Sequence, residues 1–106
     1  MPVMRGLTLL IATADPARLR VALTLASANA ALGGRTRVYF HEEAVPLLAT
    51  GDPLIATAIE TGATLIACQT GLAAAKLSAD ELPAGVETGG LIGLLADLGG
   101  DRLDTV

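Results

Sequence analysis

The sequence predicts an α/β fold, with a mostly parallel sheet of about five strands and helices on both of its faces. Three observations indicate this class. Short apolar runs alternate with longer segments of helical periodicity. Asp-Pro pairs at 15–16 and 52–53 are typical helix starts. Gly-Gly pairs at 33–34 and 99–100 are typical helix ends. Since 106 residues hold one compact core, we expect a three-layer sandwich formed by a single domain, residues 1–106.

The first half of the chain contains two predicted strands. Residues 7–12 (LTLLIA) form a continuous apolar run, typical of a strand buried on both faces. A helix is expected over residues 16–32, where aliphatic side chains recur at helical spacing. Residues 37–40 (RVYF) predict a second strand. The stretch 42–49 then resembles a short helix interrupted near Pro46.

The segment that leads to the single cysteine has the same strand and helix signals. A helix is predicted over 53–61, with Gly62 as its left-handed stop. Residues 64–67 predict a third strand, which places Cys68 at its C-terminal end. A turn at residues 69–71 is expected to lead into a helix over LAAAKL.

The last part of the chain is expected to complete the sheet. The S-x-x-E pattern at 78–81 is a capping box, which indicates a helical turn. Residues 85–87 predict a short fourth strand, and a last helix is expected from residue 88 or 89 to residue 98. A final strand is expected over 102–106.

Composition excludes some classes of partner. Hydrophobic residues make up 52% of the chain and charged residues 17%, against about 25% charged in an average domain. Because large apolar patches are rare on monomers, we expect a homo-oligomer. The net charge of −4, the two aromatic residues and the lack of a basic cluster argue against binding to nucleic acid.

Other classes lack their sequence motifs. Neither a signal-peptide pattern nor an apolar run of membrane-spanning length is present, so we expect a cytoplasmic protein without membrane contact. The chain has no phosphate-binding loop and no G-x-G-x-x-G, so no nucleotide cofactor is predicted. One cysteine forms neither an internal disulfide, a C-x-x-C site nor a zinc site built on several cysteines, and no metal is predicted.

Three polar residues follow the predicted strands, at the edge of a parallel sheet where functional groups gather. They are Asp15, His41 and Cys68. Cys68 lies between a strand end and a helix start, a position that can lower the pKa of a thiol and favour the nucleophilic thiolate. The alternative is a buried small hydrophobic residue, which is common for free cysteines.

The other candidates each have a functional and a structural interpretation. His41, the chain's one histidine, can carry a proton or pair with a thiolate, or simply lie at the surface as a capping residue. Asp15 can bind a ligand at the edge of the sheet, although its place before Pro16 already explains it as an N-cap. Glu42 and Glu43 would raise the pKa of His41 if they lie close to it, although two acids at a helix start are usually partners of the helix dipole. Lys76 can attract an anionic partner, but a solvated surface charge is the favoured interpretation.

The chain resembles the DsrE/DsrF-like family, which includes sulfur-relay subunits and proteins labelled peroxiredoxin-like. The resemblance covers the opening LTLLIATADP, the helix and strand RVALTLASANAALGG and TRVYF, the cysteine segment TLIACQTGLAAAKL, and the tail from LPAGVETGGL to DRLDTV. It implies a YchN-like fold of about five strands and assembly as trimers or hexamers. It also implies that Cys68 matches the cysteine that carries a persulfide, and it assigns no such role to His41 or Lys76.

These observations lead to a functional hypothesis with two alternatives. The hypothesis is a sulfur carrier, or sulfurtransferase, that holds sulfane sulfur as a persulfide on Cys68 and passes it from a donor protein to the thiol of an acceptor protein. One alternative is a non-enzymatic oligomeric module that binds a ligand or a protein, with Cys68 merely buried. The other is a one-cysteine protein that reacts with peroxide.

Overall fold

A computed structural model describes residues 5–106, and five strands form one parallel sheet in it. The strand order is β4-β3-β2-β1-β5, and every neighbouring pair is parallel. The strands are β1 (Leu7–Ile11), β2 (Thr36–Phe40), β3 (Thr64–Cys68), β4 (Glu87–Gly89) and β5 (Arg102–Thr105). The α/β class and the parallel sheet predicted from the sequence are confirmed.

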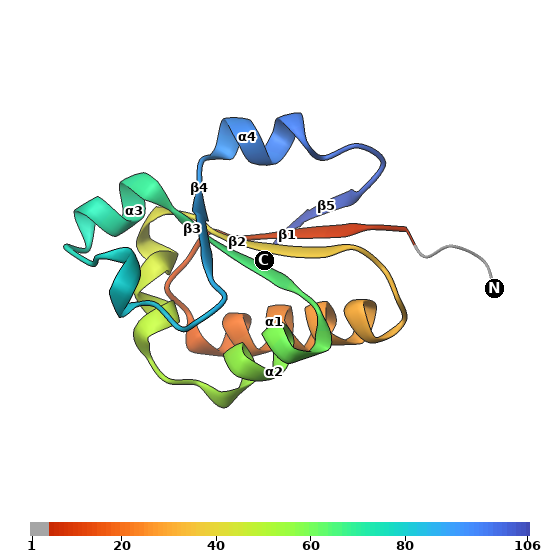
Figure 1. The fold of residues 1–106 in the computed structure, drawn as a ribbon, viewed down its shortest axis with the longest axis horizontal. Helices are drawn as coiled ribbons and strands as arrows, with labels where there is room; N and C mark the ends of the chain where they lie inside the picture. The colour runs from red at the N-terminus through yellow and green to blue at the C-terminus, as the bar shows by residue number, and fades with distance from the viewer. Residues whose placement is uncertain (1–4) are drawn as a thin grey trace.

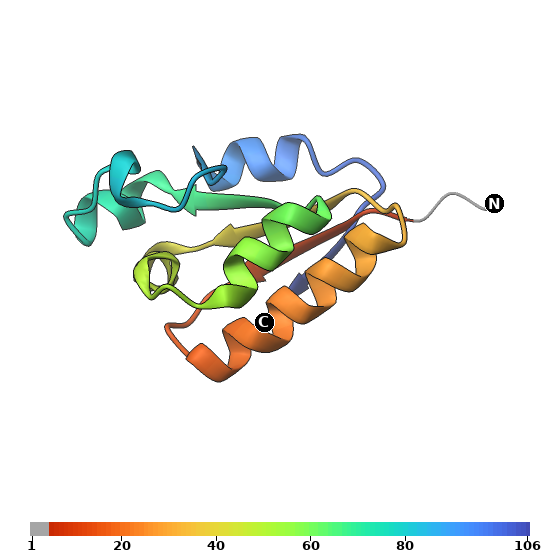
Figure 2. The same ribbon diagram turned by 60° about the horizontal axis from the view of Figure 1, so that its bottom comes forward.

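Helices cover both faces of this sheet, as Figures 1 and 2 show. Helices α1 (Pro16–Ala31) and α2 (Pro53–Thr61) lie on one face, and α4 (Leu91–Ala96) lies on the other. The chain steps in one direction from β1 to β4 and then returns across the sheet to β5. Because crossovers between parallel strands are right-handed, this change of direction places α4 on the opposite face.

Three further helices complete the fold. They are the 3₁₀ helices η1 (Glu42–Ala49) and η2 (Ala79–Glu81), and α3 (Gln69–Ala74). Figure 1 shows η1 and α3 together near the end of the sheet where β3 finishes. The connections after β2 and β3 therefore meet at the same edge of the molecule.

The predicted starts of α1 and α2 and the predicted stop of α2 are confirmed. The carboxylate of Asp15 accepts a hydrogen bond from the N–H of Ala17 at 2.9 Å, which begins α1. Asp52 accepts from the N–H of Leu54 at 3.0 Å and begins α2 in the same way. Gly62 ends α2 with φ of 113°, a left-handed conformation that glycine adopts without a steric cost.

Two predicted boundaries around the cysteine and Pro46 are wrong. Helix α3 begins at Gln69, directly after β3, so no separate turn precedes it. Pro46 lies inside η1 and does not interrupt it. A 3₁₀ helix is closed by bonds between residues three apart, and Pro46 removes only its own donor from this short element.

Two later boundaries also differ from the prediction. Strand β4 begins at Glu87, two residues after the predicted start at residue 85. Its ladder with β3 then pairs Gly89 with Cys68. Because Gly89 is still part of the sheet, α4 begins only at Leu91.

The two faces of the sheet differ in polarity. The face under α1 and α2 is aliphatic and fully buried, with Leu9, Ile11, Val38 and Leu65 at its centre. Side chains alternate along a strand, so neighbouring positions project to the α4 face. There the buried side chains include Thr8, Arg37 and Tyr39. The polar chemistry of the fold therefore lies on the α4 side of β1 and β2.

Candidate functional site

The site is built around Cys68, the last residue of β3 and a side chain that is 4% exposed. Its sulfur lies 3.0 Å from the hydroxyl oxygen of Thr70. The hydroxyl of Tyr39 and the backbone N–H groups of Glu42 and Gly71 also hydrogen-bond to the sulfur. The predicted place of Cys68 at a strand end is confirmed, and four polar groups converge on it.

These contacts change the acidity of the thiol. Burial raises the pKa of Cys68, because a low-dielectric environment disfavours the charged form. Hydrogen bonds from Thr70, Tyr39, Glu42 and Gly71 stabilise the thiolate and outweigh that effect. Together they lower the pKa from 9.0 to about 6. Cys68 is therefore largely a thiolate at neutral pH, the form that acts as a nucleophile.

Tyr39 reaches the sulfur from the neighbouring strand. It is fully buried on β2, and its partner in the ladder is Ile66, two residues before Cys68. Burial and the adjacent Cys68 raise the pKa of the Tyr39 hydroxyl, which therefore stays protonated and able to donate. Sequence reasoning missed Tyr39, although a tyrosine within a buried strand needs a partner for its hydroxyl.

Glu42 supplies its backbone N–H from a strained conformation. It is the first residue of η1 and has φ of 39°, in the left-handed region that non-glycine residues rarely adopt. Such a conformation costs on the order of 1 kcal/mol and persists only where the surroundings impose it. Here the same residue donates to the Cys68 sulfur. The backbone strain is located at the thiol.

Gly71 allows α3 to pack closely against η1. A Cβ atom at this position would lie 2.6 Å from Cγ2 of Val45 and 2.7 Å from the carbonyl oxygen of Glu42. No side chain fits at that separation, so glycine is required for the close approach. This packing brings the N–H groups of Glu42 and Gly71 to the same sulfur.

A hollow of about 490 Å³ opens beside the thiol. It is lined by Glu42, Glu43, Thr70, Gly71, Ala74 and Ala75. Three of these residues, Glu42, Thr70 and Gly71, also hydrogen-bond to the sulfur. This hollow, which we call the thiol hollow, therefore borders the groups around Cys68, although Cys68 itself is not among its lining residues.

His41 lies near the site without joining the groups that hold the sulfur. It precedes η1, and its ring centroid is 6.2 Å from that of Tyr39. Its Nδ1 atom is buried and has no hydrogen-bond partner within residues 5–106. The hydrogen bonds on Cys68 come from other groups, and the aromatic neighbour of the His41 ring is Tyr39.

The remaining sequence candidates are apart from the sulfur contacts. Asp15 acts as the N-cap of α1. Lys76 is exposed after the end of α3 and has φ of 56°. Glu43 lines the thiol hollow together with Glu42. Thr70, like Tyr39, was not anticipated, although its place two residues after Cys68 puts its hydroxyl within reach.

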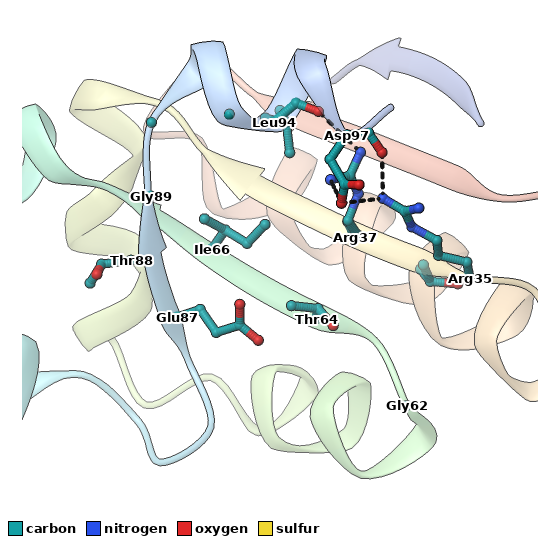
Figure 3. Close-up of a pocket in the computed structure, with 13 residues that line it drawn as sticks. Arg35, Arg37, Gly62, Thr64, Ile66, Glu87, Thr88, Gly89, Leu94 and Asp97 are labelled. Atoms are coloured by element: carbon teal, nitrogen blue, oxygen red, sulfur yellow. Dashed lines mark hydrogen bonds and ion pairs between the residues drawn. The ribbon is translucent and has the colours of Figure 1, made fainter. Parts of the chain in front are cut away.

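A second hollow, of about 450 Å³, lies between the sheet and α4 and is drawn in Figure 3. Its two arginines pair with Asp97: Nη2 of Arg35 lies 2.9 Å from that carboxylate, and Nη1 of Arg37 lies 3.5 Å from it. Glu87 of β4 lines the hollow as well. The ion pairs hold α4 on the sheet and leave neither arginine free.

Residues 5–106 contain neither a candidate metal site nor a candidate membrane-spanning helix. No cluster of three His, Cys, Asp or Glu side chains is placed to hold a metal ion in this part of the chain. Within the same residues, no helix combines the length and the apolar character needed to cross a membrane.

Comparisons with known proteins agree with this fold. The model of the DsrE/DsrF-like family matches residues 7–98. The structure of MTH1491 from Methanobacterium thermoautotrophicum is similar with a TM-score of 0.83 at 17% identity, covering 96% of this chain and 99% of that one. The ychN protein from E. coli is similar with a TM-score of 0.75 at 19% identity, covering 95% and 99%. A search of curated proteins found no match.

Proposed function

Because the chain belongs to the DsrE/DsrF-like family, we propose that it is a sulfur carrier that holds sulfane sulfur as a persulfide on Cys68. The observation that carries this proposal is the thiol itself. Four hydrogen bonds lower the pKa of Cys68 to about 6, and the thiol hollow adjoins it. A thiol that was only a core residue would have no need of these donors.

Loading is a displacement at sulfur. The Cys68 thiolate attacks the outer sulfur of a donor persulfide, R–S–SH. A bond forms between Cys68 and that sulfur, the S–S bond of the donor breaks, and the donor leaves as the thiolate R–S⁻ with the bonding electron pair. The transferred sulfur keeps its proton, so the step needs no oxidant or reductant.

Unloading is the same reaction in reverse with another partner. An acceptor thiolate attacks the outer sulfur of the Cys68 persulfide, and Cys68 leaves as a thiolate. A leaving thiol of lower pKa departs faster, so the hydrogen bonds that favour loading also favour release. The chain has one cysteine, and the acceptor thiol must therefore belong to another molecule.

The side chains around the sulfur have positioning roles in this scheme. Tyr39 and Thr70 hold the negative charge on sulfur when Cys68 attacks and again when it leaves. The N–H groups of Glu42 and Gly71 do the same from the backbone. His41 contributes no hydrogen bond to the sulfur, and the proposal assigns it no proton transfer.

Intact-mass spectrometry tests the proposal. The protein is exposed briefly to the persulfide of 2-mercaptoethanol, a donor whose carbon part carries no charge, then measured, and then treated with a small thiol. We expect a gain of one sulfur atom that the thiol removes, and no gain in Cys68→Ser. If the native protein gains no sulfur and alkylates as slowly as a buried thiol, the carrier is excluded and an inert binding module takes its place.

The same lowered pKa also supports reaction with peroxide, since thiolates are oxidised to sulfenic acids. A sulfenic acid on Cys68 would require an external thiol for its reduction, because the chain has no second cysteine. Rates of Cys68 consumption by hydrogen peroxide and by the uncharged 2-mercaptoethanol persulfide, measured side by side, decide between the two chemistries. The sulfur carrier predicts the faster reaction with the persulfide.

We also propose that the chain works as a homo-oligomer, a trimer or hexamer. Val21, Leu25 and Leu32 are exposed along α1, and Ile92 on α4 is 88% exposed. Exposed aliphatic side chains of this size are typical of surfaces that other chains cover. Sedimentation velocity measures the assembly directly, and a monomer at micromolar concentration would contradict it.

A further inference from the structure

The thiol hollow carries negative charge on one side. Glu42 and Glu43 are exposed at the start of η1 and line it. The other lining residues, Thr70, Gly71, Ala74 and Ala75, are uncharged, so no lysine or arginine offsets the two carboxylates at the lining. The whole chain has a net charge of −4. An approaching anion therefore meets only repulsion from the hollow.

The carboxylate of Glu42 is close enough to affect the groups that hold the sulfur. Burial, the neighbouring Cys68 and, to a smaller extent, the charge of Glu42 raise the pKa of the Tyr39 hydroxyl. Tyr39 itself hydrogen-bonds to Cys68. The charge of Glu42 is therefore felt at Tyr39, one of the groups that contact the sulfur.

We propose that Cys68 exchanges sulfur with a cysteine of a partner protein that is flanked by lysine or arginine, and that Glu42 and Glu43 select this partner. The inference rests on the sulfur-carrier function proposed above. Complementary charges raise the rate of encounter and suppress partners of the wrong sign. With two carboxylates at its lining, the hollow disfavours small anionic donors such as thiosulfate.

The shape of the hollow agrees with such a partner. A volume of about 490 Å³ lies within the range of about 300–1,000 Å³ that is typical of ligand sites. Ala74 and Ala75 give it an apolar wall on α3. Lysine and arginine lay their methylene stems on apolar surface while the charged head stays in water. A basic residue beside the partner's cysteine can therefore contact the alanines and the carboxylates together.

Thiol–disulfide exchange tests this charge selection without any sulfane sulfur. Two peptides are made that differ only in the residues flanking one cysteine, lysine in the first and glutamate in the second. Each is activated as the mixed disulfide with 2-thiopyridine. The Cys68 thiolate attacks the peptide sulfur, the new disulfide forms, and pyridine-2-thiolate leaves and is followed by absorbance.

Rates are expressed relative to 2-mercaptoethanol, an uncharged reference thiol that reacts with the same two peptides. We expect the lysine peptide to react with Cys68 at least about tenfold faster than the glutamate peptide at low salt, after this correction. In about 1 M salt, where the Debye length falls to about 3 Å, the preference should largely disappear.

The variant Glu42→Gln/Glu43→Gln removes both charges and keeps the side-chain size and the backbone N–H of residue 42. It should lose most of the preference. Glu60→Gln on α2 makes the same kind of charge change outside the hollow lining and should retain it. Equal preferences in these two variants, or none in the native protein, would overturn the inference.

The outcome of this test does not depend on the outcome of the sulfur-loading test. Peptide exchange reports how charge governs access to Cys68, whatever the protein carries. A charge preference without persulfide loading would reject the sulfur carrier and with it a sulfur-exchanging partner. Loading without a charge preference would keep the carrier and reject the basic partner.

Discussion

The guanidinium of Arg37 lies 3.8 Å from the carboxylate of Asp101, and each of these side chains is only 9% exposed. Arg37 is on β2, and Asp101 is in the turn before β5. The same guanidinium donates to the hydroxyl of Thr8 at 3.2 Å and to the carbonyl of Leu94 at 3.3 Å. One buried cation therefore joins β2, β1, α4 and the start of β5.

Substitution Arg37→Ala should strongly destabilise the fold. Arg35 stays 3.4 Å from Asp101. The Thr8 hydroxyl and the buried Leu94 carbonyl, however, lose their donor, and a buried hydrogen-bonding group left without a partner costs about 1–3 kcal/mol. We expect the free energy of unfolding to fall by this amount, as measured by urea denaturation followed by circular dichroism.

An exposed ion pair provides the matched control. Arg18 lies 3.7 Å from Asp15, and these side chains are 62% and 47% exposed. Because solvent screens such a pair, Arg18→Ala should cost less than about 1 kcal/mol. If Arg18→Ala and Arg37→Ala lower the free energy of unfolding by similar amounts, burial does not make the Arg37 contacts more stabilising than an exposed ion pair.

Gly71→Ala should disturb both stability and the thiol. The added methyl group would overlap Val45 and the backbone of Glu42, so α3 must move away from η1. Overpacking of this kind costs about 1–3 kcal/mol. The same movement draws two N–H donors away from the sulfur, so the pKa of Cys68 should rise. Urea denaturation and the pH dependence of alkylation measure the two effects.

Gly93→Ala distinguishes this contact from ordinary helix propensity. Gly93 is also inside a short helix, but nothing lies within 4 Å of a Cβ atom placed there. Alanine in an open helical position stabilises by about 0.5–1 kcal/mol relative to glycine. A gain for Gly71→Ala as well would mean that η1 and α3 are not closely packed at this point.

The fold was predictable because its signals are local. The apolar run of β1, the Asp-Pro helix starts and Gly62 each act through neighbouring residues, and each is where the sequence placed it. The start of β4 was not predictable in this way. It is fixed by the ladder that pairs Glu87 with Ile66, a contact between residues far apart in the chain.

The same distinction applies to the site. The position of Cys68 follows from the end of a strand, which the residues before it predict. The hydrogen bond from Tyr39 depends on the register between β2 and β3, and the N–H of Glu42 depends on a backbone conformation that glutamate rarely adopts. His41 is next to Glu42 in sequence, but its ring lies beside Tyr39, with the ring centroids 6.2 Å apart, and the hydrogen bonds on the sulfur come from other groups.

Tyr39→Phe should raise the pKa of Cys68 above about 6. Phenylalanine keeps the ring in its buried place and removes only the hydroxyl that donates to the thiolate. At pH 7 a smaller fraction of Cys68 would be ionised, and alkylation by iodoacetamide would slow. The pH at which the alkylation rate is half-maximal measures the shift.

Thr70→Val is the companion variant, because it removes the hydroxyl at 3.0 Å from the sulfur with little change in size. Thr70→Val should also raise the pH at which the alkylation rate of Cys68 is half-maximal, which we call the alkylation midpoint. An unchanged alkylation midpoint in both variants would show that the side-chain hydroxyls do not stabilise the thiolate and that the backbone N–H groups act alone.

The low pKa of Cys68 also makes stability depend on pH. The thiol has a pKa of about 6 in the folded chain and about 9.0 when unfolded. Between these values the unfolded state binds more protons than the folded state, so the free energy of unfolding rises with pH, by up to about 1.4 kcal/mol per unit. The contribution is complete above about pH 9 and is lost as the pH falls through about 6.

Cys68→Ala isolates this contribution. Urea denaturation of both proteins is measured at intervals from pH 5.5 to 9.5 with a phosphine reductant present, about half a unit beyond each pKa. Groups that both chains share cancel in the difference between the two free energies. That difference should increase in favour of the native protein across this range, with most of the change between the two pKa values. A constant difference would mean that Cys68 is an ordinary protonated thiol, and the nucleophile on which the proposed sulfur transfer depends would be absent at neutral pH.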